Sequence, residues 1–372
     1  RGKRILVFLD ELPWFDAQKS EFVSALDHFW NSFASSQPEI MLIACGSAAS
    51  WMVKNLLNNT GGLHNRVTRR IVLNPFSLAE CKRFFEQKGV VMSPYQIIET
   101  YMVFGGVPFY LNLISKRKSP AQNINDLCFG TDGELTGEFE VLYASLFRKA
   151  ERHVSAVRAL ATKNKGLTRD EIAKLAKLPK GGTLSGVLKE LELSGFIRVY
   201  RPFGKKARGA LYQLADPFTL FHFNFMEGGK TNDESFWIHA LESGGHHAWS
   251  GYAFEQVCQW HVREIKAALG ISGMIADVAG WRSEKSGPAA QIDLVIDRSD
   301  GVINLCELKY ANGEYTVTKE YDSKLRNKRD AFLRETKTKK ALHTTFVTVY
   351  GLFRNVYAAN IQSEVTADAL FK

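Results

Sequence analysis

Ala290–Tyr310 reads AQIDLVIDRSDGVINLCELKY and decides the fold of the C-terminal third of the chain. Polar and apolar residues alternate from Gln291 to Ile296, which is the period of a strand. Asp300-Gly301 follows as a turn signal, and a second apolar run comes after it. The stretch therefore predicts two strands joined by a turn.

The predicted hairpin brings charged side chains together. Glu307 and Lys309 are two residues apart, so they project from one face of the second strand. If the hairpin sets Asp293 beside Glu307, the two carboxylates repel unless a cation lies between them, and carboxylate oxygens suit Mg²⁺ or Mn²⁺. The sequence thus predicts a metal site, with an edge-strand salt bridge between Glu307 and Lys309 as the alternative.

This pattern resembles the PD-(D/E)XK nuclease superfamily, although Ile292 precedes Asp293 where that name has proline. The resemblance implies a helix at Gly251–Lys266, strands, a helix at Lys319–Lys337 and a strand at His343–Tyr350. It also implies the roles of four residues. Asp293 and Glu307 would hold the metal, Lys309 would orient or activate the attacking water, and Glu255 on the first helix would support the metal.

Length and composition favour a multidomain protein of the cytoplasm. A chain of 372 residues corresponds to two or three domains. Its five cysteines are scattered without a Cys-x-x-Cys pair, which favours buried thiols in a reducing compartment over a zinc site. No run of 18 apolar residues and no export signal is visible, so we expect no contact with a membrane.

Positive charge is concentrated in one segment. The chain has a formal charge of +9, from 48 Lys and Arg against 39 Asp and Glu. Residues 151–215 hold 14 of these basic residues and 5 of the acidic ones, so the remaining 34 and 34 cancel. Such a concentrated basic excess predicts DNA as a partner.

The chain begins with an apolar run, Arg4–Leu9, that ends in Asp10 and Glu11. A run that is apolar on both faces is typical of a central parallel strand, and ligands bind at the carboxyl ends of such strands. The run resembles the Walker B strand of an ATPase. The resemblance implies that Asp10 holds Mg²⁺ through water and that Glu11 polarises the water that attacks ATP.

The next segments are similar to archaeal-type P-loop ATPases of the AAA and STAND-like group. An amphipathic helix at residues 21–33 precedes a strand, Ile40–Cys45, and Ser47 stands where these ATPases have a sensor of the γ-phosphate. Arg66 comes before a third expected strand, Ile71–Leu73, with Asn65 in place of the family's glycine. Arg66 is a candidate nucleotide contact, or else part of a solvated loop. Phe104–Leu111 carries the Gly-Gly-x-Pro-x-Tyr-Leu segment of the family's helical lid.

The phosphate-binding loop Gly-x-x-x-x-Gly-Lys-[Ser/Thr] is missing from the 372 residues. The chain also opens on Arg1, directly at the strand that should come third in such a sheet. These observations predict that the residues are the C-terminal portion of a longer protein, whose phosphate-binding strand and Walker A loop were removed, lost or assigned elsewhere. We expect the chain alone not to hydrolyse ATP.

From Glu151 to Ala215 the pattern predicts three short helices and a basic hairpin, which together describe a winged helix. The third helix, residues 183–193, could enter a major groove while the hairpin contacts phosphates. Packing between domains is the alternative use of such a unit. The candidate DNA contacts are Thr183, Ser185 and Lys189 on the helix, and Lys205, Lys206 and Arg208 on the wing.

The expected fold class is α/β. We expect the C-terminal part of a P-loop ATPase sheet with its helical lid (1–145), an α+β winged helix (146–215), an aromatic linker (216–247) and an α/β restriction-endonuclease-like domain (248–372). The leading hypothesis is an ATPase coupled to a metal-dependent nuclease-like domain, acting in DNA processing or defence. The alternatives are a nucleotide-dependent switch and a transcription regulator, neither of which cleaves DNA. The oligomeric state stays open, with a homo-oligomer among the options.

Overall fold

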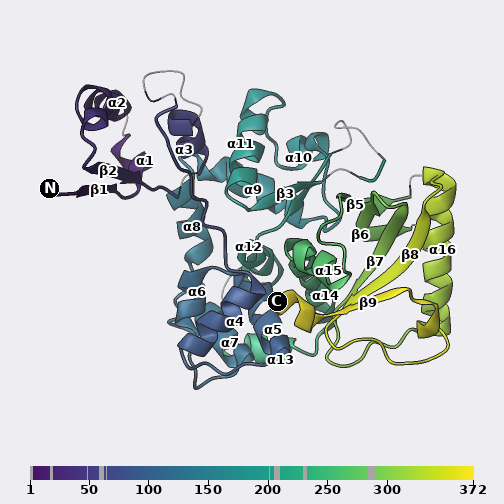
Figure 1. Ribbon diagram of the computed structural model, residues 1–372. Helices are drawn as coiled ribbons and strands as arrows, with labels where there is room; N and C mark the ends of the chain where they lie inside the picture. The colour runs from purple at the N-terminus through teal and green to yellow at the C-terminus, as the bar shows by residue number, and fades with distance from the viewer. Residues whose placement is uncertain are drawn as a thin grey trace.

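A mixed α/β architecture is seen in the computed structural model, which describes residues 3–16, 20–47, 49–57, 63, 65–200, 202–204, 210–228, 233–283 and 290–372. Helices occupy the middle of the molecule, and a five-stranded sheet forms its C-terminal side (Figure 1). A helix long and apolar enough for a membrane span does not occur in these ranges.

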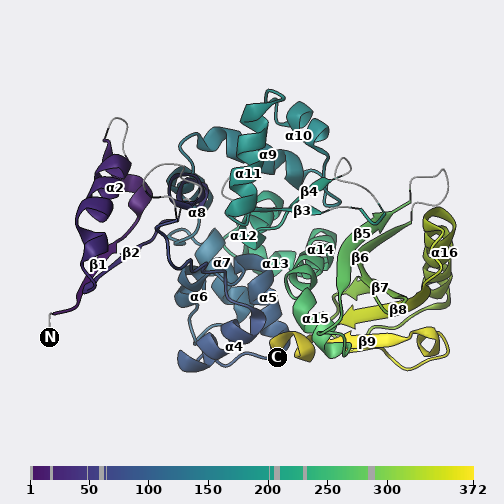
Figure 2. The same ribbon diagram turned by 45° about the horizontal axis from the view of Figure 1, so that its top comes forward.

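The N-terminal segment is a small parallel sheet that stands apart from the other elements (Figures 1 and 2). Strand β1 (Ile5–Leu9) pairs with β2 (Ile40–Ala44), in register from Ile5 opposite Ile40 to Leu9 opposite Ala44. Both strands were predicted. The short helix α1 (Leu12–Phe15) and the helix α2 (Phe22–Ser32) connect them, and α3 (Ala49–Met52) follows.

The prediction of a third strand in this segment is wrong. Ile71–Leu73 has no strand structure, and Leu73 is 91% exposed. An isolated extended segment gains nothing from its apolar side chains unless a neighbouring strand takes up its N–H and C=O groups. The three apolar residues indicated a strand, but they carry no information on whether a partner strand lies beside them.

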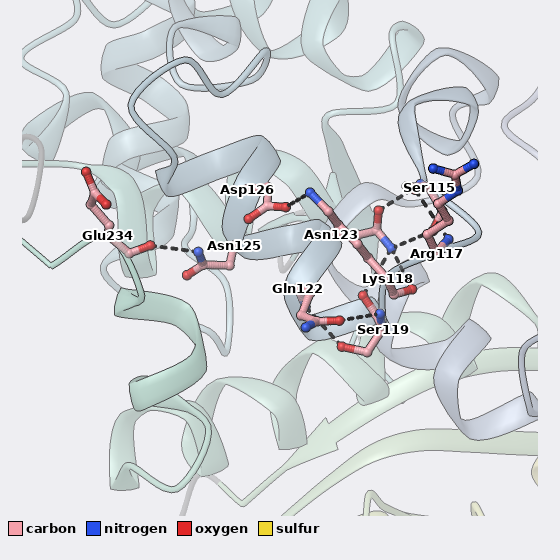
Figure 3. Close-up of polar contacts among 9 residues, drawn as sticks. All are labelled: Ser115, Arg117, Lys118, Ser119, Gln122, Asn123, Asn125, Asp126 and Glu234. Atoms are coloured by element: carbon pink, nitrogen blue, oxygen red, sulfur yellow. Dashed lines mark hydrogen bonds and ion pairs between the residues drawn. The ribbon is translucent and has the colours of Figure 1, made fainter.

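Five helices lie in the middle of the molecule, and reciprocal side-chain caps begin three of them. They are α4 (Leu78–Gln87), α5 (Pro94–Phe104), α6 (Pro108–Leu113), α7 (Pro120–Phe129) and α8 (Glu138–Leu146). Ser119 and Gln122 cap each other at the start of α7, and Asn125 Nδ2 donates to Glu234 O at 2.7 Å (Figure 3). Helix α7 is thereby tied to the segment that leads into α13 (Phe236–Ala240).

The paired glycines of the predicted lid segment have a structural cause. Gly106 O accepts from Phe76 N at 2.7 Å, and a Cβ on Gly106 would lie 1.9 Å from Phe76 O. Only glycine allows this close approach of two backbones. Pro108 then begins α6, as its fixed φ favours.

Three helices and an antiparallel hairpin follow, as the sequence predicted. They are α9 (Ala150–Ala161), α10 (Arg169–Leu175), α11 (Gly182–Leu193), β3 (Ile197–Tyr200) and β4 (Leu211–Leu214). A capping box begins α10, since Thr168 and Glu171 bond to each other's backbone N–H. The hairpin reaches the C-terminal sheet, where Phe203 N donates to Gly280 O at 2.7 Å.

The C-terminal sheet has the order β5-β6-β7-β8-β9, with β5, β6 and β7 antiparallel and β7, β8 and β9 parallel. Its strands are β5 (Ala276–Arg282), β6 (Gln291–Arg298), β7 (Val302–Lys309), β8 (Ala341–Thr348) and β9 (Ser363–Thr366). Helix α16 (Lys319–Thr336) covers one face, and α14 (Gly244–Trp260) with α15 (Val262–Ala268) covers the other (Figures 1 and 2).

The predicted helix at residues 251–266 differs from the structure in two ways. It begins seven residues earlier, at Gly244, and therefore includes His246 and His247. It also breaks at His261, which adopts φ −109° and ψ 30°. The His261 ring bonds instead to Leu78 N–H at 3.0 Å, so tertiary contacts override the helical periodicity.

The helical middle and the sheet share one hydrophobic core. A single buried cluster extends from Leu78 on α4 to Leu370 near the C-terminus. Phe218 and Phe221, on α12 (Pro217–Phe221), are almost fully buried within it. These aromatic side chains of the expected linker therefore belong to the core.

Candidate functional site

The β6–β7 hairpin brings the predicted acidic residues together. Its last backbone pair joins Leu294 to Cys306, so Asp293 and Glu307 come next in the same register. Glu307 lies on the sheet face that α16 covers, since both of its partners come from α16, and the charges of Asp293 and Glu307 both act on Glu255. Lys309 follows two residues later on that face.

Glu307 is the most enclosed member of the group, and its two oxygens have separate partners. Its side chain is 8% exposed. Tyr321 Oη donates to Glu307 Oε2 at 2.6 Å, and Lys328 Nζ donates to Glu307 Oε1 at 2.6 Å. Both partners come from α16, so this helix holds the carboxylate in one orientation.

Tyr321 and Lys328 are functional candidates that our sequence reasoning missed. They lie 14 and 21 residues after Glu307. A signal was present, because residues seven apart on a helix lie on the same face. The otherwise polar helix α16 could therefore have been expected to present this pair to the sheet.

Lys309 lies beside Glu307 without a close ion pair. Its Nζ is 3.9 Å from Glu307 Oε2 and lies over the Tyr321 ring, 5.0 Å from the centroid. The side chain is 29% exposed. The ammonium group therefore keeps donor capacity and access to solvent.

Glu255 approaches the same group from α14. Burial raises the pKa of Glu255 to about 8, and the negative charges of Asp293 and Glu307 act in the same direction. Lys309 and Lys328 oppose the shift. Side chains from α14, the hairpin and α16 therefore form one electrostatic group, in which Glu255 retains a proton near neutral pH.

Asp293 is half-buried, and its carboxylate accepts a hydrogen bond from the Gln291 amide. It also lines a cavity of about 450 Å³ between the β3–β4 hairpin and strands β5 and β6. Within the described ranges, no three His, Cys, Asp or Glu side chains lie close enough to hold a metal ion. In this arrangement Lys328 supplies the positive charge beside Glu307.

The predicted ATPase residues meet at the carboxyl end of β1 and β2. Ser47 Oγ donates to Glu11 Oε2 at 2.9 Å, and the Cys45 thiol donates to Asp10 Oδ1 at 2.6 Å. The bond to Asp10 is the main cause that raises the pKa of Cys45. Glu11 adopts a left-handed backbone conformation with φ 46° and ψ 53°, which is uncommon outside glycine and concentrates at functional sites.

Arg66 is not part of this cluster. Its backbone N–H donates to Leu63 O at 3.1 Å, and its side chain has no hydrogen bond or ion pair to Asp10, Glu11 or Ser47 in the structure as described.

The candidate DNA contacts on α11 differ in exposure. Ser185 and Lys189 are exposed, whereas Thr183 is half-buried. Ser185 Oγ donates to Gly181 O at 3.1 Å, and Lys189 pairs with Glu192 at 3.0 Å. The wing residues Lys205, Lys206 and Arg208 lie outside the described residues.

No protein-family model matches the chain, and a search of curated proteins also finds no match.

Proposed function

We propose that the chain belongs to an ATP-dependent DNA-processing protein whose C-terminal sheet carries a metal-dependent nuclease site. One observation carries this proposal. Asp293 and Glu307 each lie one residue beyond the last backbone pair of the β6–β7 hairpin, Leu294 with Cys306, and Lys309 Nζ lies 3.9 Å from Glu307 Oε2. Mg²⁺ is commonly bound through one or two carboxylates and keeps several waters, so this pair is a sufficient protein ligand set.

The roles follow from the chemistry of each side chain. Asp293 and Glu307 would hold Mg²⁺ or Mn²⁺, which when bound supplies Lewis-acid stabilisation of a phosphoryl oxygen. Lys309 would donate to the developing negative charge on the phosphate, because its ammonium group has no close ion pair. Glu255, with a pKa of about 8, would hold a proton beside the reacting groups near neutral pH.

The other parts support a DNA partner and a nucleotide. We propose that α9–α11 and the β3–β4 hairpin form a winged helix, since residues 151–215 hold the whole net charge of the chain. The exposed Ser185 and Lys189 leave part of α11 open to DNA. The cluster of Asp10, Glu11 and Ser47 would serve Mg²⁺ and ATP at the carboxyl end of the parallel strands.

Nicking of supercoiled plasmid tests the proposal. The full chain would be incubated with Mg²⁺ or Mn²⁺, with and without ATP, beside Glu307→Gln and the matched surface variant Glu314→Gln. We expect metal-dependent nicking that Glu307→Gln abolishes and Glu314→Gln retains. Equal nicking by both variants, or none by the native chain with either metal, would overturn the nuclease assignment.

A second function is favoured by the contacts of Glu307. Because Lys328 and Tyr321 already occupy both of its oxygens, the site could serve a nucleotide-dependent switch that binds DNA or a partner without cleaving it. A chain that binds DNA tightly but neither nicks it nor takes up metal would fit this function. Footprints at one defined sequence would indicate a transcription regulator.

A further inference from the structure

The cavity between the β3–β4 hairpin and strands β5 and β6 contains polar groups that the protein leaves unsatisfied. Arg198 Nε, Gln213 Oε1 and Gln291 Oε1 are buried and have no hydrogen-bond partner. All three residues line the cavity, and Gln213 is only 6% exposed. Buried polar atoms without partners are costly, so such a group points to a ligand or ordered water.

The charges around the cavity favour an anion. Among the described residues, Lys165, Arg198 and Arg282 line it, and Asp293 contributes the one carboxylate. Arg198 makes no ion pair with any carboxylate that the structure describes, and its only side-chain bond is to the amide oxygen of Gln256. Burial lowers the pKa of Arg198 to about 10, which is the effect of a guanidinium kept from water without a counter-ion.

The other residues that line the cavity suit an aromatic ring with hydrogen-bonding groups on its edge, such as a nucleotide base. Tyr200 lines the cavity, and its ring packs closely against Gly280. A Cβ added to Gly280 would lie 3.3 Å from Tyr200 Cε2. Burial raises the pKa of Tyr200 to about 12, Asp293 adds to this shift, and Arg198 and Arg282 oppose it. The ring therefore lies within electrostatic reach of all three charges. The unsatisfied amide oxygens of Gln213 and Gln291 can accept hydrogen bonds from an N–H group of such a ring.

We propose that this cavity binds a nucleotide through its phosphate and its base, with the phosphate on Arg198 and the base between Tyr200 and the amides of Gln213 and Gln291. A volume of about 450 Å³ falls in the range that holds small ligands. The nucleotide is either a free mononucleotide or the phosphorylated end of a DNA strand. Binding at this position does not require that the chain cleave DNA.

Titration calorimetry of the full chain in EDTA tests this proposal separately from cleavage. The probes are dAMP, dTMP, the matching nucleosides, inorganic phosphate, and a short single strand with either a 5′-phosphate or a 5′-hydroxyl. We expect a mononucleotide to bind at least tenfold more tightly than its nucleoside and than phosphate. A phosphorylated strand that competes with the mononucleotide identifies a strand end as the ligand, and failure to compete identifies the free nucleotide.

Substitutions locate the bound nucleotide. Arg198→Met, Arg282→Met and Gln213→Leu should each weaken mononucleotide binding at least fivefold, whereas the exposed Arg117→Met should leave it unchanged. Arg282 is exposed, so its variant is expected to fold even if Arg198→Met does not. The proposal is overturned if no mononucleotide binds at millimolar concentration, if phosphate alone binds equally well, or if Arg282→Met and Gln213→Leu bind like the native chain.

Discussion

His261 shows how a single side chain joins distant segments. Its Nδ1 donates to Val257 O at 2.8 Å, and its Nε2 accepts from Leu78 N–H at 3.0 Å. The second bond requires a neutral ring, and burial accordingly lowers the pKa of His261. The imidazole thus links the end of α14 to the start of α4.

We predict from this arrangement that acid destabilises the chain. The folded state resists protonation of His261, so below pH about 6.5 the unfolded chain binds more protons and the free energy of unfolding falls. His261→Gln should lower stability at neutral pH but flatten this fall by up to about 1.4 kcal/mol per pH unit. Urea unfolding between pH 5 and 8 measures both effects. Unchanged acid sensitivity in His261→Gln, with the exposed His247→Gln as control, would refute the link.

The ion pair between Lys328 and Glu307 should stabilise the folded chain. Lys328→Met removes the closest cation from the enclosed Glu307, and we expect a loss on the order of 2 kcal/mol, less than for a fully buried pair because Lys309 remains near. Mg²⁺ should restore part of this stability if the ion takes the place of the ammonium group. Lys324→Met, which affects only an exposed pair with Glu320, should cost less than about 1 kcal/mol. Thermal unfolding with and without Mg²⁺ decides the matter, and a Lys328→Met variant that Mg²⁺ fails to stabilise counts against metal at Glu307.

At the scale of elements, stacked tyrosines connect α5 to the sheet beside the site. Tyr95 stacks on Tyr310 with ring centroids 5.3 Å apart and on Tyr350 at 5.8 Å. Tyr310 directly follows Lys309. A movement of α5 would therefore displace the end of β7.

A double-mutant cycle measures this connection. Tyr95→Leu and Tyr310→Leu should show a coupling of about 0.5–1.5 kcal/mol in chemical unfolding, as aromatic pairs do. Tyr95→Leu combined with Tyr315→Leu should be additive, because Tyr315 packs in a separate cluster. If the losses of unfolding free energy in Tyr95→Leu and Tyr310→Leu are additive, the two rings do not stabilise each other.

The sequence predicted elements well where local pattern and tertiary structure agree. The hairpin from Gln291 to Lys309 has alternating residues and a turn signal, and it folds as predicted. Strand β9 (Ser363–Thr366) was not predicted, because it is defined by its pairing with β8 in the folded sheet. The break at His261 and the failure of Ile71–Leu73 depend on partners far away in sequence. For the same reason the contacts of Lys328 and the cavity at Arg198 could not be predicted from spacing.

For the whole molecule, the position of the charge predicts how DNA binds. If residues 151–215 carry the contact, affinity should fall with salt by roughly 0.9 in log-log slope for each phosphate neutralised. Reversing Lys205, Lys206 and Arg208 should flatten this slope in fluorescence anisotropy. The control reverses three lysines at α16, namely Lys319 and Lys324 on the helix and Lys337 directly after its end. An unchanged slope in the first variant would move the DNA site away from the hairpin.

We propose that Asp293, Glu307 and Lys309 form a metal-dependent nuclease site, and metal binding and cleavage measured separately on single-residue variants distinguish their roles. Mn²⁺ calorimetry with DNA present and plasmid nicking would be run on the native chain, Asp293→Asn and Lys309→Met. The proposal predicts that Asp293→Asn loses both activities, while Lys309→Met binds Mn²⁺ within about threefold of the native affinity and loses nicking, because an ammonium group is not a metal ligand. Native Mn²⁺ affinity in Asp293→Asn, or full nicking by Lys309→Met, would contradict it.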